Sequence, residues 1–257
     1  MPLAAFLPLR SVHRIREAIP HDRVMAFNNY RDLCHAFHDR SFDALILDTH
    51  RLDAGYDDLR RCLQKDPIPI LAYIDPSPRS VSLLLELLPL GVSQVVLRGF
   101  GDTKARLERA IGDLHTVDTG VLFLNALRTQ LLRLPFELEL ALIAIFSSAS
   151  ITSAKALADT AGATRRSIDR WLSAEGLQSA SWFLGLARLL KSFPVLMAGG
   201  SLTAAARASG LASRRTFERQ TLQLAGIPAG ELASRLSSDP DGVMRSLVRR
   251  SYRSSKG

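Results

Sequence analysis

The chain has 257 residues, enough for two domains, and 47 % hydrophobic with 23 % charged residues is an ordinary composition for a soluble globular protein. No apolar run reaches the ~18 residues of a membrane span, and two cysteines without metal or disulfide spacing fit a reducing, cytoplasmic setting. The net charge of +8 is confined to one half: residues 1–115 carry 15 basic and 15 acidic side chains, whereas residues 116–257 carry 18 and 10. This asymmetry predicts a polyanionic partner for the second half.

Short apolar runs alternate with amphipathic stretches over residues 1–115. The predicted strands are Leu3–Leu9, Val24–Phe27, Ala44–Leu47, Ile68–Ile74 and Val92–Leu97. The predicted helices are Ser11–Ile19, Tyr30–Arg40, Tyr56–Gln64, Arg79–Leu90 and Thr103–Leu114. This alternation predicts a five-stranded parallel sheet with helices on both faces, most commonly in the flavodoxin-like order.

The strongest local pattern in this half is the apolar run Phe42–Asp48, which ends in an aspartate. Together with residues 68–74 and 91–100 it resembles the receiver domain of bacterial response regulators, and the resemblance covers residues 1–115. In that family an aspartate at this place accepts a phosphoryl group. The resemblance therefore makes Asp48 the candidate phosphoacceptor.

Other positions depart from the receiver pattern. The place of the family's magnesium-binding acidic pair reads Phe6-Leu7-Pro8-Leu9, the phosphate-sensing Ser or Thr is Ile74, and the phosphate-pairing Lys is Arg98. Phosphoryl transfer to a carboxylate needs a divalent cation, and a single carboxylate binds magnesium poorly. We therefore predict a degenerate receiver that serves signal input or dimerisation. The alternative role for Asp48 is to cap the loop that follows it.

Few groups could support metal binding or catalysis. Cys34, His35 and His38 share one predicted helix, but no further cluster completes a four-ligand site. Asp48 and His50 lie at a strand end without a nucleophile or an oxyanion-stabilising group. We therefore predict no metal, no cofactor and no enzymatic activity.

One pattern occurs twice in the second half, over residues 157–172 and 205–219. In each copy a small alanine is followed four residues later by a glycine, Gly162 or Gly210, which suits the left-handed end of a helix. A serine or threonine then suits the N-cap of a second helix, at whose start two arginines stand. Each copy predicts a helix-turn-helix, in which the first turns of the second helix reach the major groove of DNA.

With these motifs the chain resembles the AraC/XylS family of transcription regulators, over about residues 137–235. The clearest matches are residues 201–220, with Phe217 in the place of a core aromatic, and the closing segment 226–232. The resemblance implies two helix-turn-helix units, joined by a long helix, that reach successive major grooves on one face of DNA. Pro194 departs from this pattern and predicts that the joining helix kinks or ends early.

Helical periodicity separates the groove-facing side of each second helix from its buried side. The predicted base-reading or base-orienting residues are Arg165, Arg166, Asp169, Arg170, Arg214, Arg215, Glu218 and Arg219. The predicted phosphate-binding hydroxyls are those of Thr164, Ser167, Ser213 and Thr216. The predicted inward residues are Ile168, Trp171, Leu172, Phe217, Thr221 and Leu222, with Trp182 also in the core.

The chemistry of these side chains fits base reading. Arginine suits bidentate contact with guanine, and a carboxylate could accept from cytosine or orient an adjacent arginine. The alternative for each arginine is a solvated helix face.

These patterns divide the chain into four parts. Residues 1–115 form the receiver-like domain, residues 116–136 a linker with a helix near Val121–Leu134, and residues 137–237 the DNA-binding domain. Residues 238–257 are predicted to be a flexible basic tail that adds sequence-independent affinity. The predicted fold class is a flavodoxin-like α/β domain followed by an all-α double helix-turn-helix domain.

The sequence predicts a cytoplasmic, bacterial-type transcription regulator that reads double-stranded DNA. RNA polymerase and a second copy of the chain, bound through the first domain, are the further expected partners. Two alternatives stay open. The paired helix-turn-helix units could be the scaffold of a protein–protein adaptor that binds DNA weakly, or the chain could be a response regulator driven by phosphorylation of Asp48.

Overall fold

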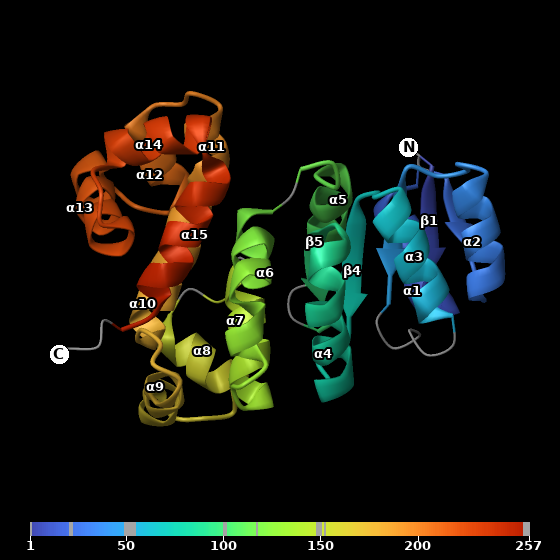
Figure 1. Ribbon diagram of the computed structural model, residues 1–257, viewed down its shortest axis with the longest axis horizontal. Helices are drawn as coiled ribbons and strands as arrows, with labels where there is room; N and C mark the ends of the chain where they lie inside the picture. The colour runs from blue at the N-terminus through green and yellow to red at the C-terminus, as the bar shows by residue number, and fades with distance from the viewer. Residues whose placement is uncertain are drawn as a thin grey trace. The chain divides into compact units, whose positions relative to one another are not determined.

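The computed structural model describes residues 2–20, 23–48, 55–99, 102–116, 118–147, 151 and 153–253. The chain forms two compact units, Met1–Val121 and Leu122–Gly257 (Figure 1). The division falls inside helix α6 (Thr119–Leu131), within the stretch predicted as a linker. None of the helices in the described part of the chain has the length and apolar content of a membrane-crossing segment.

The first unit contains a five-stranded parallel sheet. Its strands are β1 (Leu3–Phe6), β2 (Val24–Ala26), β3 (Ala44–Leu47), β4 (Ile70–Ile74) and β5 (Val92–Leu97). They lie in the order β2-β1-β3-β4-β5, so the predicted flavodoxin-like fold is confirmed. Leu3 pairs with Val24 on one side and with Ala44 on the other, and Tyr73 pairs with Val96.

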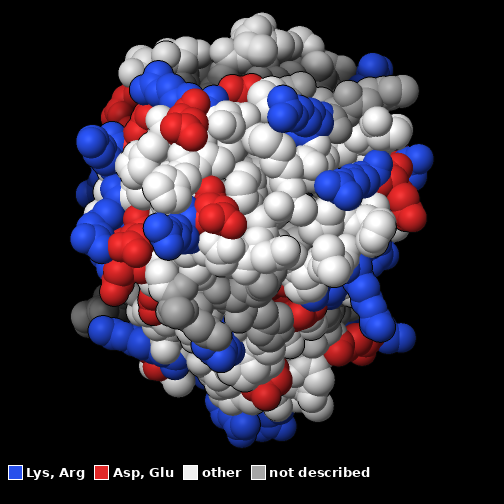
Figure 2. Space-filling model, turned by 90° about the vertical axis from the view of Figure 1, so that its right-hand side faces the viewer, with Lys and Arg blue, Asp and Glu red and all other residues white. Residues whose placement is uncertain are grey.

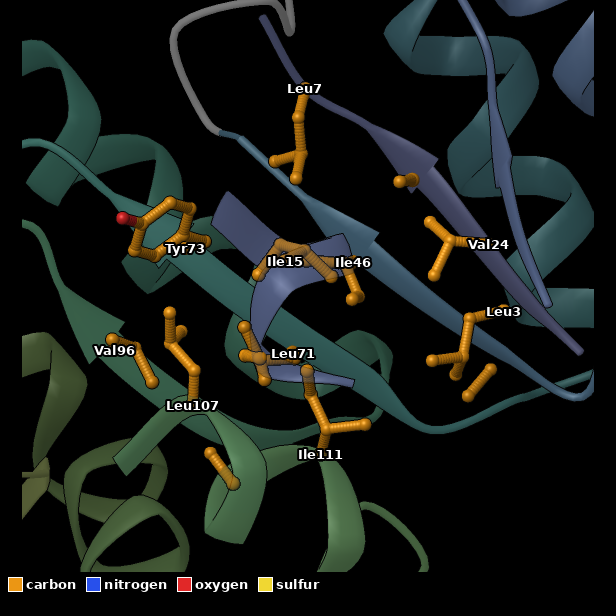
Figure 3. Packing of buried hydrophobic residues seen from close by; sticks show 14 of the residues in the cluster. Leu3, Leu7, Ile15, Val24, Ile46, Leu71, Tyr73, Val96, Leu107 and Ile111 are labelled. Atoms are coloured by element: carbon orange, nitrogen blue, oxygen red, sulfur yellow. The ribbon is translucent and has the colours of Figure 1, made fainter. Parts of the chain in front are cut away.

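Helices cover both faces of the sheet. They are α1 (Leu9–Ala18), α2 (Tyr30–His38), α3 (Tyr56–Lys65), α4 (Pro78–Leu87) with the short 3₁₀ helix η2 (Leu88–Leu90), and α5 (Lys104–Gly112). On one face, residues of the strands pack with α1 and α5 in an apolar cluster that includes Ile15, Ile46 and Leu107 (Figure 3). On the other face, the ring centre of Phe6 lies 4.4 Å from that of Tyr30 on α2.

The first strand is shorter than the predicted Leu3–Leu9. β1 stops at Phe6, and Leu9 begins α1 with 68 % of its surface exposed. Pro8 explains the difference, because its fixed φ suits the residue before a helix and it has no N–H to donate to a sheet. The fourth predicted helix is likewise divided, since α4 ends at Leu87 and η2 follows.

The second unit is built from helices. They are α6, α7 (Phe136–Ser147), α8 (Ala154–Thr160), α9 (Arg165–Ala174), α10 (Ala180–Leu190), α11 (Phe193–Met197), α12 (Leu202–Ala208), α13 (Arg214–Ala225), α14 (Ala229–Ser238) and α15 (Pro240–Ser251). The rings of Phe123, Phe146 and Phe183 join α6, α7 and α10 in one core, with successive centroid distances of 4.9 and 6.3 Å. The joining helix α10 ends at Leu190, and Pro194 lies in the first turn of α11. The prediction that the joining helix ends early is therefore confirmed.

Most of the predicted flexible tail is folded, so this prediction for residues 238–257 is wrong. Residues 240–251 form α15, whose buried residues are Val243, Met244, Leu247 and Ser251. The arginines of this segment suggested a solvated polycation. Its apolar residues, however, recur at helical spacing and form one face of a helix that packs against the rest of the unit. Residues 254–257 lie outside the described residues.

Candidate nucleic-acid interface

Two pairs of short helices repeat one local geometry. α8 and α9 are joined through Gly162, and α12 and α13 through Gly210; both glycines have the predicted left-handed conformation, with φ of 55° and 69°. Open space lies where a Cβ would project from either residue, so the backbone conformation, rather than crowding, favours glycine. The structure thus contains both predicted helix-turn-helix units.

A hydroxyl side chain caps the second helix of each pair. Thr164 Oγ1 accepts from the N–H of Ser167 at 3.1 Å, and Ser213 Oγ accepts from the N–H of Thr216 at 3.2 Å. In each cap the two hydroxyl oxygens also lie in hydrogen-bond contact, at 3.0 and 2.9 Å. The four predicted phosphate-binding hydroxyls therefore form two pairs, each at a helix start where backbone N–H groups also favour an anion.

Buried side chains hold these two helices against the rest of the unit. Ile168 and Leu172 on α9 are fully buried, as are Phe217 and Thr221 on α13, which matches their predicted inward orientation. The same prediction for Leu222 is wrong, because 53 % of its surface is exposed. At ~100° per residue, Leu222 lies about 140° around the helix from Phe217 and so faces away from the core.

The two tryptophans are only partly buried, whereas the sequence placed both Trp171 and Trp182 in the core. Trp182 packs edge-on against the buried ring of Phe183, at a centroid distance of 5.2 Å. An indole is large enough to cover apolar neighbours with one edge while another edge stays in solvent.

The predicted arginines of α9 are all exposed. Arg165 is oriented by its neighbours: Nε lies 3.8 Å from Asp169 Oδ2, and Nη2 donates to Ser181 Oγ at 3.4 Å. Among the described residues, no carboxylate pairs with Arg166 or Arg170. Both of these guanidinium groups can therefore reach a ligand without breaking an internal ion pair.

Asp169 makes a structural contact that the sequence did not predict. Its Oδ1 accepts from the backbone N–H of Ala180 at 3.1 Å, which joins α9 to the first turn of α10. The carboxylate thus caps α10 and also faces Arg165, and the residue is only partly exposed. This arrangement favours the orienting role of Asp169 over direct acceptance from a base.

The surface of α13 follows the same plan. Arg214 Nε donates to Glu218 Oε1 at 2.8 Å, an i,i+4 pair that holds the guanidinium along the helix. Arg215 and Arg219 are exposed and have no acidic partner in the described part of the chain. Six arginines and two carboxylates therefore lie along the exposed sides of α9 and α13, which is a charge balance suited to DNA.

α15 connects the ends of these two helices. Arg250 Nε donates to the carbonyl oxygen of Leu224 at 2.8 Å, in the last turn of α13, where carbonyls lack helical donors. Just beyond α15, the N–H of Arg253 donates to Gly176 O at 2.8 Å and its Nη1 to Ser173 Oγ at 2.9 Å, next to the end of α9. Figure 1 shows α15 running from α14 toward α10. One helix therefore ties both helix-turn-helix units together.

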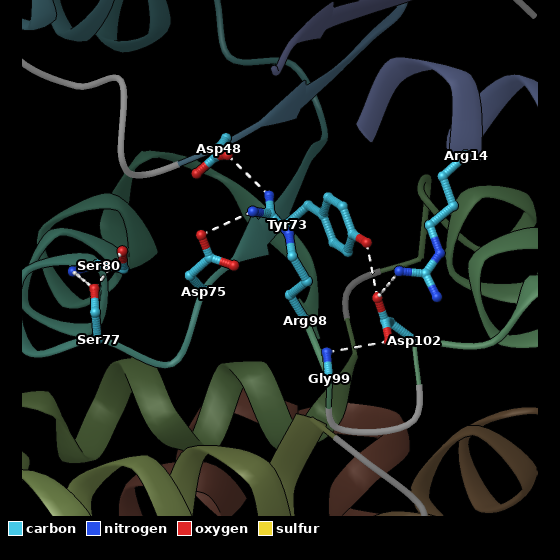
Figure 4. A network of polar contacts seen from close by, with 9 residues as sticks. All are labelled: Arg14, Asp48, Tyr73, Asp75, Ser77, Ser80, Arg98, Gly99 and Asp102. Atoms are coloured by element: carbon cyan, nitrogen blue, oxygen red, sulfur yellow. Dashed lines mark hydrogen bonds and ion pairs between the residues drawn. The ribbon is translucent and has the colours of Figure 1, made fainter. Parts of the chain in front are cut away.

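An ion-pair network surrounds the buried Asp48 at the carboxyl edge of the first unit's sheet (Figure 4). Asp48 is fully buried, and its Oδ2 accepts from Arg98 Nη2 at 2.9 Å. The same guanidinium donates from Nη1 to Asp75 at 2.7 Å and lies 4.8 Å from the centre of the Tyr73 ring. Burial lowers the pKa of Arg98, but the hydrogen bond and charge of Asp48, together with Asp75, outweigh burial and leave this pKa raised, so Arg98 stays charged.

Asp102 extends the network along the same edge (Figure 4). Its Oδ2 accepts from Tyr73 Oη at 2.8 Å and pairs with Arg14 Nη1 at 2.8 Å, while Oδ1 accepts from the N–H of Gly99 at 3.1 Å. Burial, and then the hydrogen bond to Asp102, raise the pKa of Tyr73, so the phenol stays protonated. Tyr73 and Asp102 are 29 residues apart, and nothing local in the sequence indicated their contact.

The remaining residues that the sequence suggested for metal binding or catalysis are three side chains on α2 and His50, which follows Asp48 in the chain. Cys34, His35 and His38 lie on α2, and burial, followed by the neighbouring Cys62, raises the pKa of the Cys34 thiol to about 12. In the part of the chain that the structure describes, no three His, Cys, Asp or Glu side chains are placed to bind a metal ion. His50, and the loop that Asp48 was expected to cap, lie outside the described residues.

Charge on the first unit is mixed. Figure 2 shows the face on the α2 side of Figure 1, where basic and acidic side chains are interspersed. This distribution agrees with the equal numbers of basic and acidic residues in 1–115. The basic surplus of the chain belongs to its second half.

No model of a known protein family matches the chain, and no curated protein matches it significantly. Among solved structures, full-length FixJ from B. japonicum matches with a TM-score of 0.36 and 15 % identity, over 97 % of this chain and 96 % of that chain. RcsB from Salmonella enterica serovar Typhimurium, bound to promoter P1flhDC in the presence of phosphomimetic BeF3−, matches with a TM-score of 0.37 and 13 % identity, over 92 % and 97 %. At these scores and identities the similarity assigns no function to this chain.

Proposed function

We propose that this chain is a sequence-specific transcription regulator of the AraC type, which binds double-stranded DNA and reads successive major grooves with α9 and α13. The observation that carries the proposal is the repeated geometry of these helices. Each begins with a pair of capping hydroxyls and two exposed arginines, and each is held by a buried apolar face. Hydroxyls and helix N-termini suit phosphates, and arginines suit guanine edges. On this proposal the protein acts by binding alone and catalyses no reaction.

The position of α15 supports simultaneous reading by both helices. A bipartite site needs a fixed spacing between its two readers, and the joining helix α10 ends at Leu190. α15 supplies a second connection, because its Arg250 contacts the end of α13 while Arg253 contacts the end of α9.

We assign signal input or dimerisation to the first unit, as a degenerate receiver. The support for this role is the Arg98 guanidinium, which already pairs with the buried Asp48 that would accept a phosphoryl group. The first unit would then bind a second copy of the chain. The regulator would also contact RNA polymerase.

The test is selection of the full chain on a random-sequence duplex library at about physiological salt, where non-specific contacts are partly screened. We expect enrichment of a bipartite site whose halves are about one helical turn apart. Retention of DNA without sequence enrichment would contradict the proposal and favour the protein–protein adaptor.

A pair of double variants identifies the residues involved. Arg214→Ala with Arg215→Ala should abolish preference for the selected site, whereas Arg60→Ala with Arg61→Ala, an exposed arginine pair on α3, should leave it unchanged. The two variants remove the same charge. Equal losses in both would show a general charge effect, and unchanged preference in the first would overturn the assignment of α13.

A further inference from the structure

The fold brings together the two cysteines of the chain, Cys34 and Cys62. Cys34 lies on α2 and Cys62 on α3, and these two helices pack against each other. The two side chains share a hydrogen bond, and both are free thiols. Their spacing in the sequence gave no sign of a pair, because the contact depends on the packing of α2 against α3.

The buried faces of the two helices place both thiols at the junction between them. The buried residues include Leu33 and Phe37 on α2, and Leu59 and Leu63 on α3. Each cysteine is adjacent in sequence to one of these leucines, so at ~100° per residue it lies at the edge of the buried face of its helix. Both side chains are therefore only partly buried.

A groove of about 700 Å³ between α2 and α3 gives access to the pair. Both cysteines line this groove, together with the cationic side chains of Arg31, Arg61 and Lys65. A small solute in the groove can therefore reach both sulfurs without unfolding either helix. Reactive cysteines are found in partly exposed, electropositive surroundings of this kind, whereas cysteines enclosed in an apolar core are inert.

The surroundings favour a bond between the sulfurs over a bound metal ion. Zinc takes four ligands, and among the described residues no three His, Cys, Asp or Glu side chains are placed to bind a metal ion. His35 and His38 line the same groove but are exposed. Two thiols already in hydrogen-bond contact need only small side-chain rotations to reach the short S–S bond of a disulfide.

We propose that Cys34 and Cys62 form a reversible disulfide when the protein meets a peroxide, so that oxidation joins α2 to α3. The Cys62 thiolate attacks one peroxide oxygen, the O–O bond breaks, and hydroxide leaves with a proton as water, which makes Cys62 a sulfenic acid. The Cys34 sulfur then attacks the Cys62 sulfur. The S–S bond forms, the S–O bond breaks, and the departing hydroxide takes the Cys34 proton as water. The two sulfurs together lose two electrons, which reduce the peroxide to water.

Cys62 attacks first because Cys34 holds its proton tightly. Burial, followed by the charge of Cys62 and the hydrogen bond to it, raises the pKa of the Cys34 thiol to about 12. A thiol that keeps its proton is a poor nucleophile, and by donating a hydrogen bond it stabilises a thiolate beside it. Once Cys62 is oxidised its negative charge is gone, so Cys34 can lose its proton more easily and close the bond.

The bond would close residues 34–62 into a covalent loop that contains β3 and Asp48. Both cysteines belong to the first unit, whereas the arginines assigned to DNA belong to the second. Formation of the disulfide therefore does not depend on the proposed DNA-reading function.

The test is treatment of the reduced full chain with a small excess of hydrogen peroxide, followed by N-ethylmaleimide in urea and intact-mass spectrometry. We expect the parent chain to lose two hydrogens and take up no maleimide, at a rate constant that stays the same over about a tenfold range of protein concentration. A tryptic digest without reductant should contain peptides 32–40 and 62–65 joined together, and dithiothreitol should restore both thiols. Uptake of two maleimides, a covalent dimer, or sulfinic acids in place of the disulfide would overturn the proposal.

Two matched variants, Cys34→Ser and Cys62→Ser, each leave one thiol and should form no internal disulfide. Cys34→Ser should accumulate a sulfenic acid on Cys62 that dimedone traps, and Cys62→Ser should give at least about tenfold less of this product. Unfolding midpoints of both variants show that they fold. Equal trapping would contradict the assignment of Cys62 as the attacking sulfur. Equally fast disulfide formation in the parent chain unfolded in urea would show that the fold does not pair the sulfurs.

Discussion

Arg250 on α15 donates from Nε to the carbonyl oxygen of Leu224 at 2.8 Å and thereby links the last turns of α15 and α13. Its Nη2 also lies 3.4 Å from the carbonyl oxygen of Gln223. A cation at a helix C-terminus satisfies carbonyls that lack helical donors and interacts favourably with the negative end of the helix. A residue expected in a flexible tail is therefore part of the packing of the second helix-turn-helix unit.

The first prediction concerns this contact. Arg250→Ala should lower the free energy of unfolding by about 1–2 kcal/mol, because the carbonyls of α13 lose a charged donor. The measurement is urea unfolding of the full chain, with the transition of the second unit followed by tryptophan fluorescence. Arg249→Ala, at a neighbouring residue that has no ion pair with the described residues, should change stability by less than about 0.5 kcal/mol. Equal effects of the two variants would mean that the contact to Leu224 contributes nothing specific.

The second prediction compares two glycines near the same contact. Gly226 has φ of 75°, and a Cβ there would meet the Arg250 guanidinium, so Gly226→Ala should cost about 1–2 kcal/mol of unfolding free energy. Gly230 lies in α14 with open space around it, so Gly230→Ala should leave stability unchanged or raise it by up to about 1 kcal/mol. Urea unfolding of both variants tests the difference. A harmless Gly226→Ala would show that the Arg250 guanidinium can move aside and that residue 226 tolerates its positive φ at little cost.

The third prediction concerns Glu139, a buried carboxyl on α7. Its Oε1 has no hydrogen-bond partner among the described residues, and burial raises its pKa from 4.5 to about 7. Because the folded protein holds this proton more tightly than the unfolded chain, stability should be higher below the unfolded pKa and fall as pH rises toward about 7. Glu139→Gln should remove this decline and add about 1–3 kcal/mol at about pH 8 relative to about pH 5.

The control for Glu139 is on the same helix. Glu137 is exposed in the first turn of α7, and Glu137→Gln should keep the pH dependence of the parent chain. Urea unfolding across this pH range provides the comparison. If Glu139→Gln and the parent chain lose stability equally with rising pH, another group is responsible for the dependence.

The fourth prediction concerns phosphorylation of Asp48. Incubation with acetyl phosphate and magnesium should leave the intact mass of the protein unchanged, because the buried carboxylate of Asp48 is already paired with the Arg98 guanidinium. Mass spectrometry of the parent chain and of Asp48→Asn decides the matter. A gain of one phosphoryl group in the parent chain, absent from Asp48→Asn, would restore the phosphorylation-driven response regulator.

Local patterns were enough for much of the fold. The strands Ala44–Leu47 and Val92–Leu97 have the predicted bounds, because a short apolar run between turn residues is a signal contained in the run itself. The caps Thr164 and Ser213 were also predictable, since each accepts from a backbone N–H only three residues away. The parallel order of the sheet followed from the alternation of these elements along the chain.

The candidate interface was predictable only in part. The positions of its arginines follow from the helix starts, but the contact from Asp169 to the N–H of Ala180 and the exposure of Leu222 depend on how the helices pack. The direction of a side chain on a helix can be read from spacing only when the buried face is known, and neighbouring helices decide that face.

The amino-acid sequence therefore specifies local features: which segments form strands and helices, where they begin, and where cations lie on them. The pairing of Arg98 with Asp48, 50 residues away, and of Arg253 with Ser173, 80 residues away, depends on how each unit packs. The two kinds of interaction differ in their reach along the chain. Caps and periodicities act over one or two helical turns, whereas ion pairs and helix contacts join residues whose approach is set by the packing of the whole unit.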